Sequence, residues 1–287
     1  MNTPSSPVAS LVAVACDFGV IVSSVVSPTQ AAISVPRAAG DRYEFALELL
    51  ATGDAVSVRE QLPLRLPVFC PDRHINEGGW FCLGWDSTAV PEVVDEKSAR
   101  AWWTAVVRFL QLQLAANELG VWVNQSNDWA HGNAAIHQEL AEAAAKILGA
   151  RFRDDLRAAR FLVTRKLHTR GARLELRRDG RLTARVAVGP PDRLMDRRVV
   201  CPCDESAGVP VDACRDHSDQ LIRFTVALWR WKEAEAQFLR ELARRGAVCC
   251  GTLKKCKLRD AIAREKASTL TSDRHARRHK SRRRPRL

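Results

Sequence analysis

The sequence lacks an uncharged apolar run long enough to cross a membrane. The apolar stretch from Val8 to Val26 is interrupted by Asp17, and no basic residue precedes it. A signal peptide needs a basic start, and a membrane helix needs about 20 apolar residues. We therefore expect neither of these, no membrane partner and a cytoplasmic protein. Residues 1–35 are interpreted as an apolar N-terminal segment, with a strand or hairpin from Leu11 to Val26.

A glycine-rich phosphate loop of the Walker type is also absent, so we expect any ATP-dependent step to belong to another protein. The sequence lacks a basic surface spread along its whole length as well. Of the net charge of +12, eight positive charges lie in residues 274–287, which hold no acidic residue. We interpret residues 261–287 as a basic disordered tail that contacts nucleic acid only non-specifically.

Cysteine, by contrast, is plentiful. The chain of 287 residues has nine cysteines, several of them close to one another and accompanied by histidine. Without a secretion signal, such spacing indicates metal or thiol chemistry in a reducing compartment rather than disulfides. The hydrophobic content of 46% and charged content of 27% are typical of a globular protein with one or two domains.

The stretch Val68 to Trp85, VFCPDRHINEGGWFCLGW, holds the first candidate site. His74, Asn76 and Cys82 flank a Gly-Gly turn, and His74 and Cys82 are eight positions apart. A loop of this length can fold back and bring an imidazole, an amide and a thiol to one surface. Nucleophilic thiol chemistry needs such neighbours, because the amide can stabilise an oxyanion.

The order of motifs here resembles the active-site region of ubiquitin-conjugating enzymes. The proline-containing segment 62–67 precedes His74-Ile75-Asn76, and Phe81-Cys82-Leu83 follows. Ile75 replaces the family's proline, and the loop before Cys82 is shorter. The resemblance covers residues 40–150. It implies that Cys82 is the thioester nucleophile, that Asn76 steadies the oxyanion and that His74 supports the loop.

The predicted elements follow the order of that fold. Strands are expected at 43–49 and near 56–58, and helices at 98–119 and 133–148, each closed by a glycine. The family's N-terminal helix is missing from this prediction, because residues 1–35 do not have a helical pattern.

The second half changes character at Arg151. We expect a basic helix over 151–166, a hairpin over 172–188 around Asp179-Gly180, and a long amphipathic helix over about 218–245. One face of the hairpin holds Arg173, Arg177, Arg181 and Arg185. That row is either a solvated face or a surface for an acidic partner or nucleic acid.

A second candidate site lies in the cysteine-rich part. Cys201 and Cys203 form a Cys-x-Cys motif, and Cys214 and His217 follow as Cys-x-x-His. Zinc prefers thiolates and imidazoles at such short spacing, so the four residues would close one tetrahedral site. Three further cysteines are also predicted metal ligands. Cys250 and Cys256 could replace two of the first four, or Cys249, Cys250 and Cys256 could form part of a second site.

This half resembles the cysteine-rich region of bacterial proteins in which a ubiquitin-conjugating-like domain precedes a cysteine-rich domain. The Cys-x-Cys motif, Cys249-Cys250-Gly251-Thr252-Leu253 and Cys256-x-Leu258-Arg259 account for the likeness. Such proteins are similar to components of conjugation operons thought to act in phage defence. The resemblance implies three partners: a ubiquitin-like protein, its activating enzyme and a deconjugating peptidase.

A rival interpretation makes the first site a metal site. Cys70, His74, Cys82, His131 and His137 would then form an N-terminal metal cluster. Metal binding at Cys82 would suppress its nucleophilicity, so this rival excludes the thioester function. The protein would then be a non-catalytic metal-binding adaptor, or a zinc-type nucleic-acid binder.

The prediction as a whole is an α+β chain. A ubiquitin-conjugating-like domain at 36–150, with an antiparallel meander plus helices, precedes a zinc-stabilised cysteine-rich domain at 151–260. The expected activity is that of a transferase. Cys82 accepts a ubiquitin-like protein by transthiolation and passes it to an amine.

Overall fold

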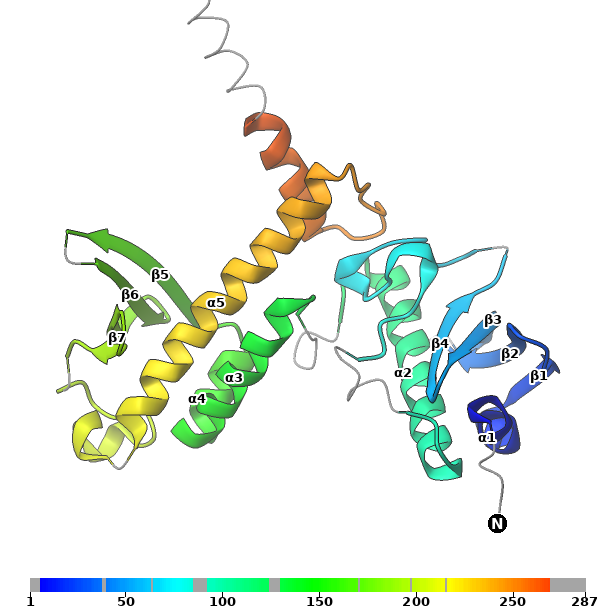
Figure 1. Ribbon diagram of the computed structural model, residues 1–287, viewed down its shortest axis with the longest axis horizontal. Helices are drawn as coiled ribbons and strands as arrows, with labels where there is room; N and C mark the ends of the chain where they lie inside the picture. Colours follow the sequence, from blue (N-terminus) through cyan, green and yellow to red (C-terminus); the bar gives the residue numbers. More distant parts are fainter. Residues whose placement is uncertain are drawn as a thin grey trace, which may run out of the picture. The chain divides into compact units, whose positions relative to one another are not determined.

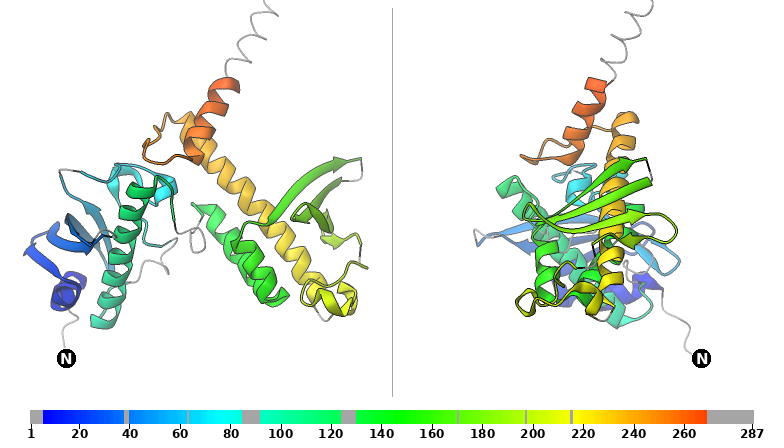
Figure 2. Two further views of the ribbon diagram at one scale, coloured as in Figure 1. Left: turned by 180° about the vertical axis from the view of Figure 1, so that it is seen from behind. Right: turned by 90° about the vertical axis from the view of Figure 1, so that its left-hand side faces the viewer.

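The computed structural model describes residues 6–37, 40–62, 64–84, 92–123, 130–169, 171–196, 198–214 and 216–268. Two compact units make up the chain, and Figures 1 and 2 show their elements. The first unit combines residues 1–124 with residues 239–287, and the second comprises residues 125–238. Within the described ranges, no helix combines the length and the apolar character that crossing a membrane requires.

The first unit contains a four-stranded antiparallel meander. Helix α1 (Pro7–Val14) and a short 3-10 helix (Ala15–Phe18) precede strands β1 (Val20–Ser24), β2 (Thr29–Pro36), β3 (Arg42–Thr52) and β4 (Ala55–Glu60), and helix α2 (Glu96–Leu119) follows. The strands pair in sequence order, which confirms the predicted meander (Figure 1).

The start of the chain differs from the prediction. Residues 7–14 form helix α1, although we expected no N-terminal helix and a strand or hairpin from Leu11 to Val26; within that range Val20–Ser24 does form strand β1. Ser6 caps this helix by accepting a hydrogen bond from the Ala9 N–H, and Pro7 occupies the first turn, where a missing N–H costs nothing. These local signals outweigh the uniformly apolar composition, which does not distinguish a helix from a strand.

One face of the meander builds the core of the first unit. Inward side chains alternate along the strands, as a half-buried sheet requires. They are Ala31, Ile33, Val35, Phe45, Leu47, Leu49, Val56 and Val58. Helix α2 supplies two fully buried tryptophans: Trp102 donates from Nε1 to the Val56 carbonyl and Trp103 to the Leu11 carbonyl, both at 3.0 Å. Helix α2 is therefore fastened to both β4 and α1.

The second unit packs helices against another antiparallel sheet. Helices α3 (Asn133–Leu148) and α4 (Ala150–Arg157) precede strands β5 (Phe161–His168), β6 (Gly171–Arg178), β7 (Arg181–Val188) and β8 (Arg193–Leu194), and helix α5 (His217–Arg244) follows. The strands again pair in sequence order. Five consecutive residues of α5, 224–228, are buried, so this helix is covered on more than one side.

Phenylalanines join the layers of this unit. Phe152 of α4, Phe161 of β5 and Phe224 of α5 contact one another with ring centroids 4.5 to 5.1 Å apart. The predicted helix over 151–166 is therefore wrong in its second part: residues 161–168 form β5, because they pair along their whole length with β6. Helix α3 packs into this core through its alanines, although we had placed residues up to 150 in the first domain.

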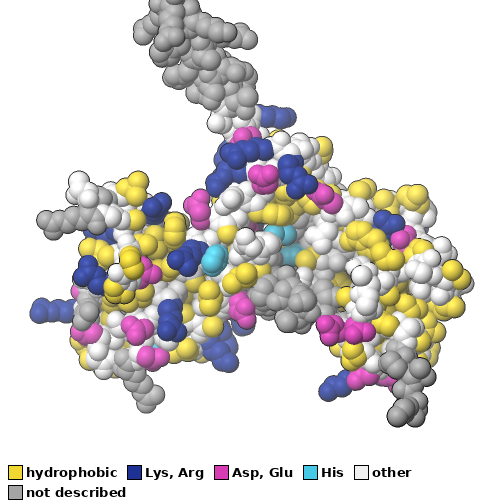
Figure 3. All heavy atoms as spheres, viewed as in Figure 1, with side chains coloured by type: hydrophobic (Ala, Val, Ile, Leu, Met, Phe, Trp, Pro, Cys, Tyr) yellow, Lys and Arg dark blue, Asp and Glu magenta, His cyan; other side chains and the backbone are white. Residues whose placement is uncertain are grey.

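The predicted arginine face is largely engaged within the protein. The Glu175 carboxylate, on β6, is buried under four cations, with N–O distances of 2.9 to 3.7 Å. These cations are Lys166, Arg173, Arg177 and Arg185. On the face drawn in Figure 3, the basic side chains of this unit are interspersed with acidic and apolar ones.

Candidate functional site

The loop from Cys70 to Cys82 folds back on itself as the sequence predicted. Ile75 pairs with both Cys70 and Phe81 in antiparallel bridges. The Cys82 N–H donates to the His74 carbonyl at 2.8 Å, and the Asn76 N–H donates to the Trp80 carbonyl at 2.8 Å. The turn between these pairs passes through Gly78 and Gly79, which both have φ near +80°, a conformation that favours glycine. The backbone thus places Cys82 directly beside His74.

Burial sorts the side chains of this loop into two groups. Ile75 and Phe81 point into the core, and Phe81 stacks on Phe109 of α2 with 4.5 Å between ring centroids. His74 and Cys82 are half-buried and Asn76 is exposed. The three predicted catalytic residues therefore lie on the outer side of a loop whose inner side is anchored in the core.

The segment before the loop is also held in place. Glu60, at the end of β4, is buried, and its Oε2 accepts hydrogen bonds from the N–H groups of Arg65 and Leu66 at 2.9 and 2.8 Å. Leu66 is buried in the core of the first unit. Pro63, part of the predicted proline-rich motif, lies outside the described residues.

The Cys82 thiol lies in a partly desolvated environment. It donates a hydrogen bond to the Gly84 carbonyl, with 3.0 Å between Sγ and O. Burial raises the pKa of this thiol, while the backbone of Gly84 acts in the opposite direction. In the resting protein Cys82 is therefore a protonated thiol rather than a preformed thiolate.

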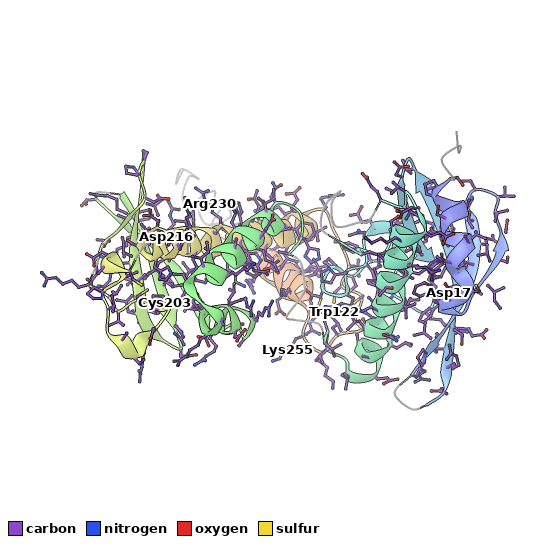
Figure 4. The ribbon with its side chains drawn as sticks, turned by 90° about the horizontal axis from the view of Figure 1, so that it is seen from below. Asp17, Trp122, Cys203, Asp216, Arg230 and Lys255 are labelled. Carbon is purple, nitrogen blue, oxygen red and sulfur yellow. The ribbon has the colours of Figure 1, made fainter. Side chains whose placement is uncertain are left out.

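His74 and Asn76 have different surroundings. His74 has a left-handed backbone conformation with φ of 55°, and its ring lies 5.6 Å from that of Trp122, which is labelled in Figure 4. This packing suits the supporting role that the resemblance implied. The Asn76 side chain is exposed to solvent beside the loop, where an amide can reach an incoming group.

The rival N-terminal metal cluster does not assemble within the part of the chain that the structure describes. One group of three or more potential metal ligands lies together there, and it contains none of Cys70, His74 and Cys82. His131 and His137 belong to the second unit, where the His131 ring stacks on Phe238 at 5.0 Å. Burial lowers the pKa of His137.

The group that does assemble is the predicted Cys-x-Cys and Cys-x-x-His set. The ligand atoms of Cys201, Cys203, Cys214 and His217 all lie within 4.8 Å of one another. The His217 Nδ1 is 3.2 Å from the Cys201 Sγ and 3.3 Å from the Cys214 Sγ. Three sulfur atoms and one imidazole nitrogen around a common point could bind a metal ion.

Local backbone structure explains why these four residues meet. The Cys201 N–H donates to the Val209 carbonyl at 2.8 Å, and the Val211 N–H donates to the Val199 carbonyl at 2.9 Å, which closes a short hairpin. His217 is the first residue of α5. Figure 4 labels Cys203 and also Asp216, the residue before His217 at the start of this helix.

The burial of Cys201 indicates what a metal ion would change in this group of ligands. Cys201 is fully buried, and desolvation raises its pKa to about 12. A thiol with so high a pKa stays protonated at neutral pH unless a cation replaces its proton. A bound metal ion would supply that cation and would cross-link the hairpin to the start of α5.

The three other predicted metal ligands lie elsewhere. Cys249, Cys250 and Cys256 follow α5 and belong to the first unit. There the Cys250 Sγ is 3.0 Å from the Cys70 Sγ, and the Cys249 Sγ is 3.2 Å from the Cys256 Sγ. Sequence reasoning did not foresee that Cys70 pairs with Cys250, because no local spacing connects residues so far apart.

Comparisons with known proteins agree with this architecture. The family model of the prokaryotic E2 domain matches residues 23–124, and that of the cysteine-rich domain C-terminal to the E2 domain matches residues 130–258. No curated protein and no solved structure matches the chain. The two domains together indicate a role in a conjugation pathway. The chain therefore consists of a prokaryotic E2 domain followed by the cysteine-rich domain that lies C-terminal to it.

Proposed function

We propose that this protein is a thioester-forming carrier for a ubiquitin-like protein and that Cys82 is its nucleophile. The observation that supports this most directly is the folded-back loop, in which the Cys82 N–H bonds to the His74 carbonyl. That hydrogen bond holds the thiol at the outer side of a rigid loop in an E2 domain. The thiol is partly exposed, and the Asn76 side chain, six positions earlier in the same loop, is exposed to solvent.

The proposed reaction is two successive acyl transfers. The Cys82 thiol first loses its proton, and its sulfur attacks the thioester carbonyl that joins the ubiquitin-like protein to its activating enzyme. A new sulfur–carbon bond forms, the old one breaks, and the leaving thiolate takes up a proton. An acceptor amine then attacks the Cys82 thioester, loses a proton and forms an amide as the Cys82 thiol is restored.

Two neighbouring residues have separate roles in this scheme. The Asn76 amide donates a hydrogen bond to the oxyanion of each tetrahedral intermediate, where such donors act most strongly. His74 keeps the loop in its left-handed turn through its contact with Trp122 and is a positioning residue. The chain has no Walker-type loop, so the activating enzyme would consume the ATP.

A thioester assay with the activating enzyme, ATP and the ubiquitin-like protein tests the nucleophile. Wild-type protein should form an adduct that thiols cleave. Cys82→Ser should give a thiol-resistant ester or no adduct, because an oxygen ester resists thiol cleavage. Cys82→Ala should give none. The matched control is Cys16→Ser, an exposed cysteine that lies outside every site described above. An adduct that persists unchanged in Cys82→Ala contradicts the proposal.

Zinc is the metal that the cysteine-rich domain would hold. The donor set of Cys201, Cys203, Cys214 and His217 supports this choice, since three thiolates and one imidazole are a common structural zinc set. The same set supports the second candidate function, a non-catalytic adaptor stabilised by metal. The adaptor would bind the partners of the pathway but would form no adduct in the thioester assay.

A further inference from the structure

Four cysteines from two distant parts of the chain form two separate sulfur pairs in the first unit, and the four sulfur atoms do not all lie within 4.8 Å of one another. Cys70 lies at the base of the Cys82 loop, whereas Cys249, Cys250 and Cys256 follow α5. Their sulfur atoms form two close pairs, Cys70 with Cys250 at 3.0 Å and Cys249 with Cys256 at 3.2 Å. Cys70 and Cys256 are fully buried, and the other two are half-buried.

Backbone amides point at these sulfurs. The Gly251 N–H donates to the Cys249 Sγ at 3.5 Å, and the Arg259 N–H donates to the Cys256 Sγ at 3.5 Å. The donors lie two and three residues beyond the cysteine that accepts. Backbone N–H groups in such short turns can also donate to a metal-bound sulfur, so both turns could hold their cysteine in place as a metal ligand.

A buried cation lies beside the same cysteines. Arg73 is fully buried, and its guanidinium donates to the Gln113 side chain at 2.7 Å, to the Gln113 carbonyl at 3.2 Å and to the Thr252 hydroxyl at 3.0 Å. All three acceptors are neutral, and no carboxylate of the described residues forms an ion pair with Arg73. The Thr252 hydroxyl is 3.1 Å from the Cys250 Sγ. A buried charge needs a counter-charge nearby, and thiolates would provide it.

We propose that Cys70, Cys249, Cys250 and Cys256 bind a second divalent metal ion, of the zinc class, as four thiolates. Four thiolates around a divalent ion have a net negative charge, which offsets the positive charge of Arg73. In a tetrahedral site with Zn–S distances of about 2.3 Å, the sulfurs are about 3.8 Å apart. Metal binding therefore opens each sulfur pair slightly and draws the two pairs together.

This second centre would hold the Cys82 loop in place. Cys70 exchanges two backbone hydrogen bonds with Ile75, both at 3.0 Å, and Ile75 pairs with Phe81 next to Cys82. The Asp72 carboxylate also accepts a hydrogen bond from the Lys257 N–H at 2.7 Å. The metal ion would fasten the segment after α5 to the base of the loop. The metal-binding proposal itself does not depend on the proposed transfer reaction.

Metal content of the full-length chain, purified from zinc-supplemented cells under reducing conditions, tests this second site. Elemental analysis and native mass spectrometry should find about two zinc ions in wild type and about one in the Cys201→Ser/Cys203→Ser variant. Adding Cys70→Ser to that variant should remove the remaining ion. Cys16→Ser should keep both. Because Cys70 is fully buried, the half-buried Cys250→Ser serves as the second variant and should lose one ion as well.

Cobalt substitution identifies the ligands. In the Cys201→Ser/Cys203→Ser variant, Co²⁺ should give an intense sulfur-to-cobalt charge-transfer band, and Cys250→Ser should abolish or strongly reduce it. Retention of a single metal ion by wild type, with no loss in Cys70→Ser or Cys250→Ser, overturns the proposal. So does a peptide map that shows Cys70–Cys250 and Cys249–Cys256 disulfides in protein kept reduced during purification.

Discussion

At the scale of single residues, the reactivity of Cys82 depends on how far its surroundings favour the thiol. The side chain is half-buried, and its S–H donates to the Gly84 carbonyl. Burial favours the neutral form and raises the pKa above the ordinary value of about 8.5, while the Gly84 backbone acts in the opposite direction. A partner that brings positive charge close to the thiol would act in the opposite direction to burial and favour the thiolate.

The raised pKa predicts a pH profile. Below its pKa, a thiol gains about tenfold in thiolate fraction per pH unit, and the thiolate is the nucleophile. We expect alkylation of Cys82 by iodoacetamide, followed by peptide mass spectrometry, to accelerate steadily from pH 6.5 to beyond pH 8.5. The exposed Cys16 provides the comparison in the same sample and should react faster. A rate for Cys82 that levels off near pH 7 contradicts the raised pKa.

The residues of the Cys82 loop could be predicted because they are neighbours in sequence. His74, Asn76 and Cys82 surround one glycine turn, and the Cys201, Cys203, Cys214 and His217 spacing is equally local. Cys70 and Cys250, by contrast, meet only through tertiary packing across 180 positions. The buried Arg73 was not predicted either, since a buried arginine has no sequence signature.

At the scale of elements, the structure corrects two predictions for the same reason. Residues 7–14 are mostly apolar and residues 161–168 mix apolar with basic side chains, and neither short pattern separates a helix from a strand. The cap residue Ser6 favours a helix over residues 7–14. Residues 161–168 form a strand because they pair along their whole length with β6. The long amphipathic helices were easier to predict: the expected 98–119 and 218–245 correspond to α2 and α5 within two residues. Periodicity over many turns leaves little ambiguity.

The first metal cluster gives a prediction for the second unit. Elemental analysis should find that Cys201→Ser/Cys203→Ser lowers the zinc content and the melting temperature. Structural zinc contributes on the order of 10 kcal/mol in small metal-folded modules, and a unit with its own hydrophobic core should lose less than that. Hydrogen exchange should increase around residues 199–217 first. Wild-type protein without metal, or the same melting temperature in the variant, contradicts the zinc assignment.

The buried Glu175 predicts a pH-dependent contribution to the β5–β7 sheet. Its hydrogen bond from Lys166, with Arg173 and Arg185 nearby, lowers the pKa of this carboxyl. The folded state therefore holds fewer protons than the unfolded state, whose glutamate pKa is about 4.3. The stabilisation is present above that pH and is lost as the pH falls through the lower, folded-state value.

Glu175→Gln should therefore lower the melting temperature at pH 7, because four cations lose their shared anion. The difference in melting temperature between Glu175→Gln and wild type should become smaller as the pH falls below about 4. Asp154→Asn is the matched control, since the Asp154 side chain is 65% exposed and its removal should change little. If this difference in melting temperature stays constant from pH 7 to pH 3, the cations around Glu175 do not lower its pKa as proposed.

At the scale of the whole molecule, the first unit combines residues from both ends of the chain. Of the described residues, 239–268 belong to the first unit, although the predicted boundaries at 150 and 260 followed the sequence order. Amino-acid composition shows where along the chain one kind of segment ends and another begins. It does not show which earlier segment a later segment contacts in the fold. Here the contacts include single hydrogen bonds: the Arg73 guanidinium donates to the Thr252 hydroxyl, and the Lys257 backbone N–H donates to the Asp72 carboxylate.

The basic tail gives the last prediction. The predicted disordered tail is wrong for residues 261–268, because residues 257–268 form a helix. Residues 269–287 lie outside the described part of the chain, and residues 274–287 hold eight Lys and Arg side chains and no acidic one. Phosphate affinity grows with the number of paired cations and weakens steeply with salt, by a logarithmic slope of about −0.9 per phosphate neutralised on duplex DNA. We expect full-length protein to bind DNA with a steep salt slope. Deleting residues 274–287 should nearly abolish that slope and leave adduct formation at Cys82 intact.

The arginine face supplies the competing outcome. Three of its arginines, Arg173, Arg177 and Arg185, share the buried Glu175 carboxylate, which reduces the charge that the sheet can offer to phosphate. Fluorescence anisotropy at two salt concentrations, on the full chain and the truncated chain, separates the two surfaces. If the truncated chain still binds tightly and prefers one DNA sequence, the second unit is a nucleic-acid reader. The thioester carrier would then no longer be the function that the chain supports best.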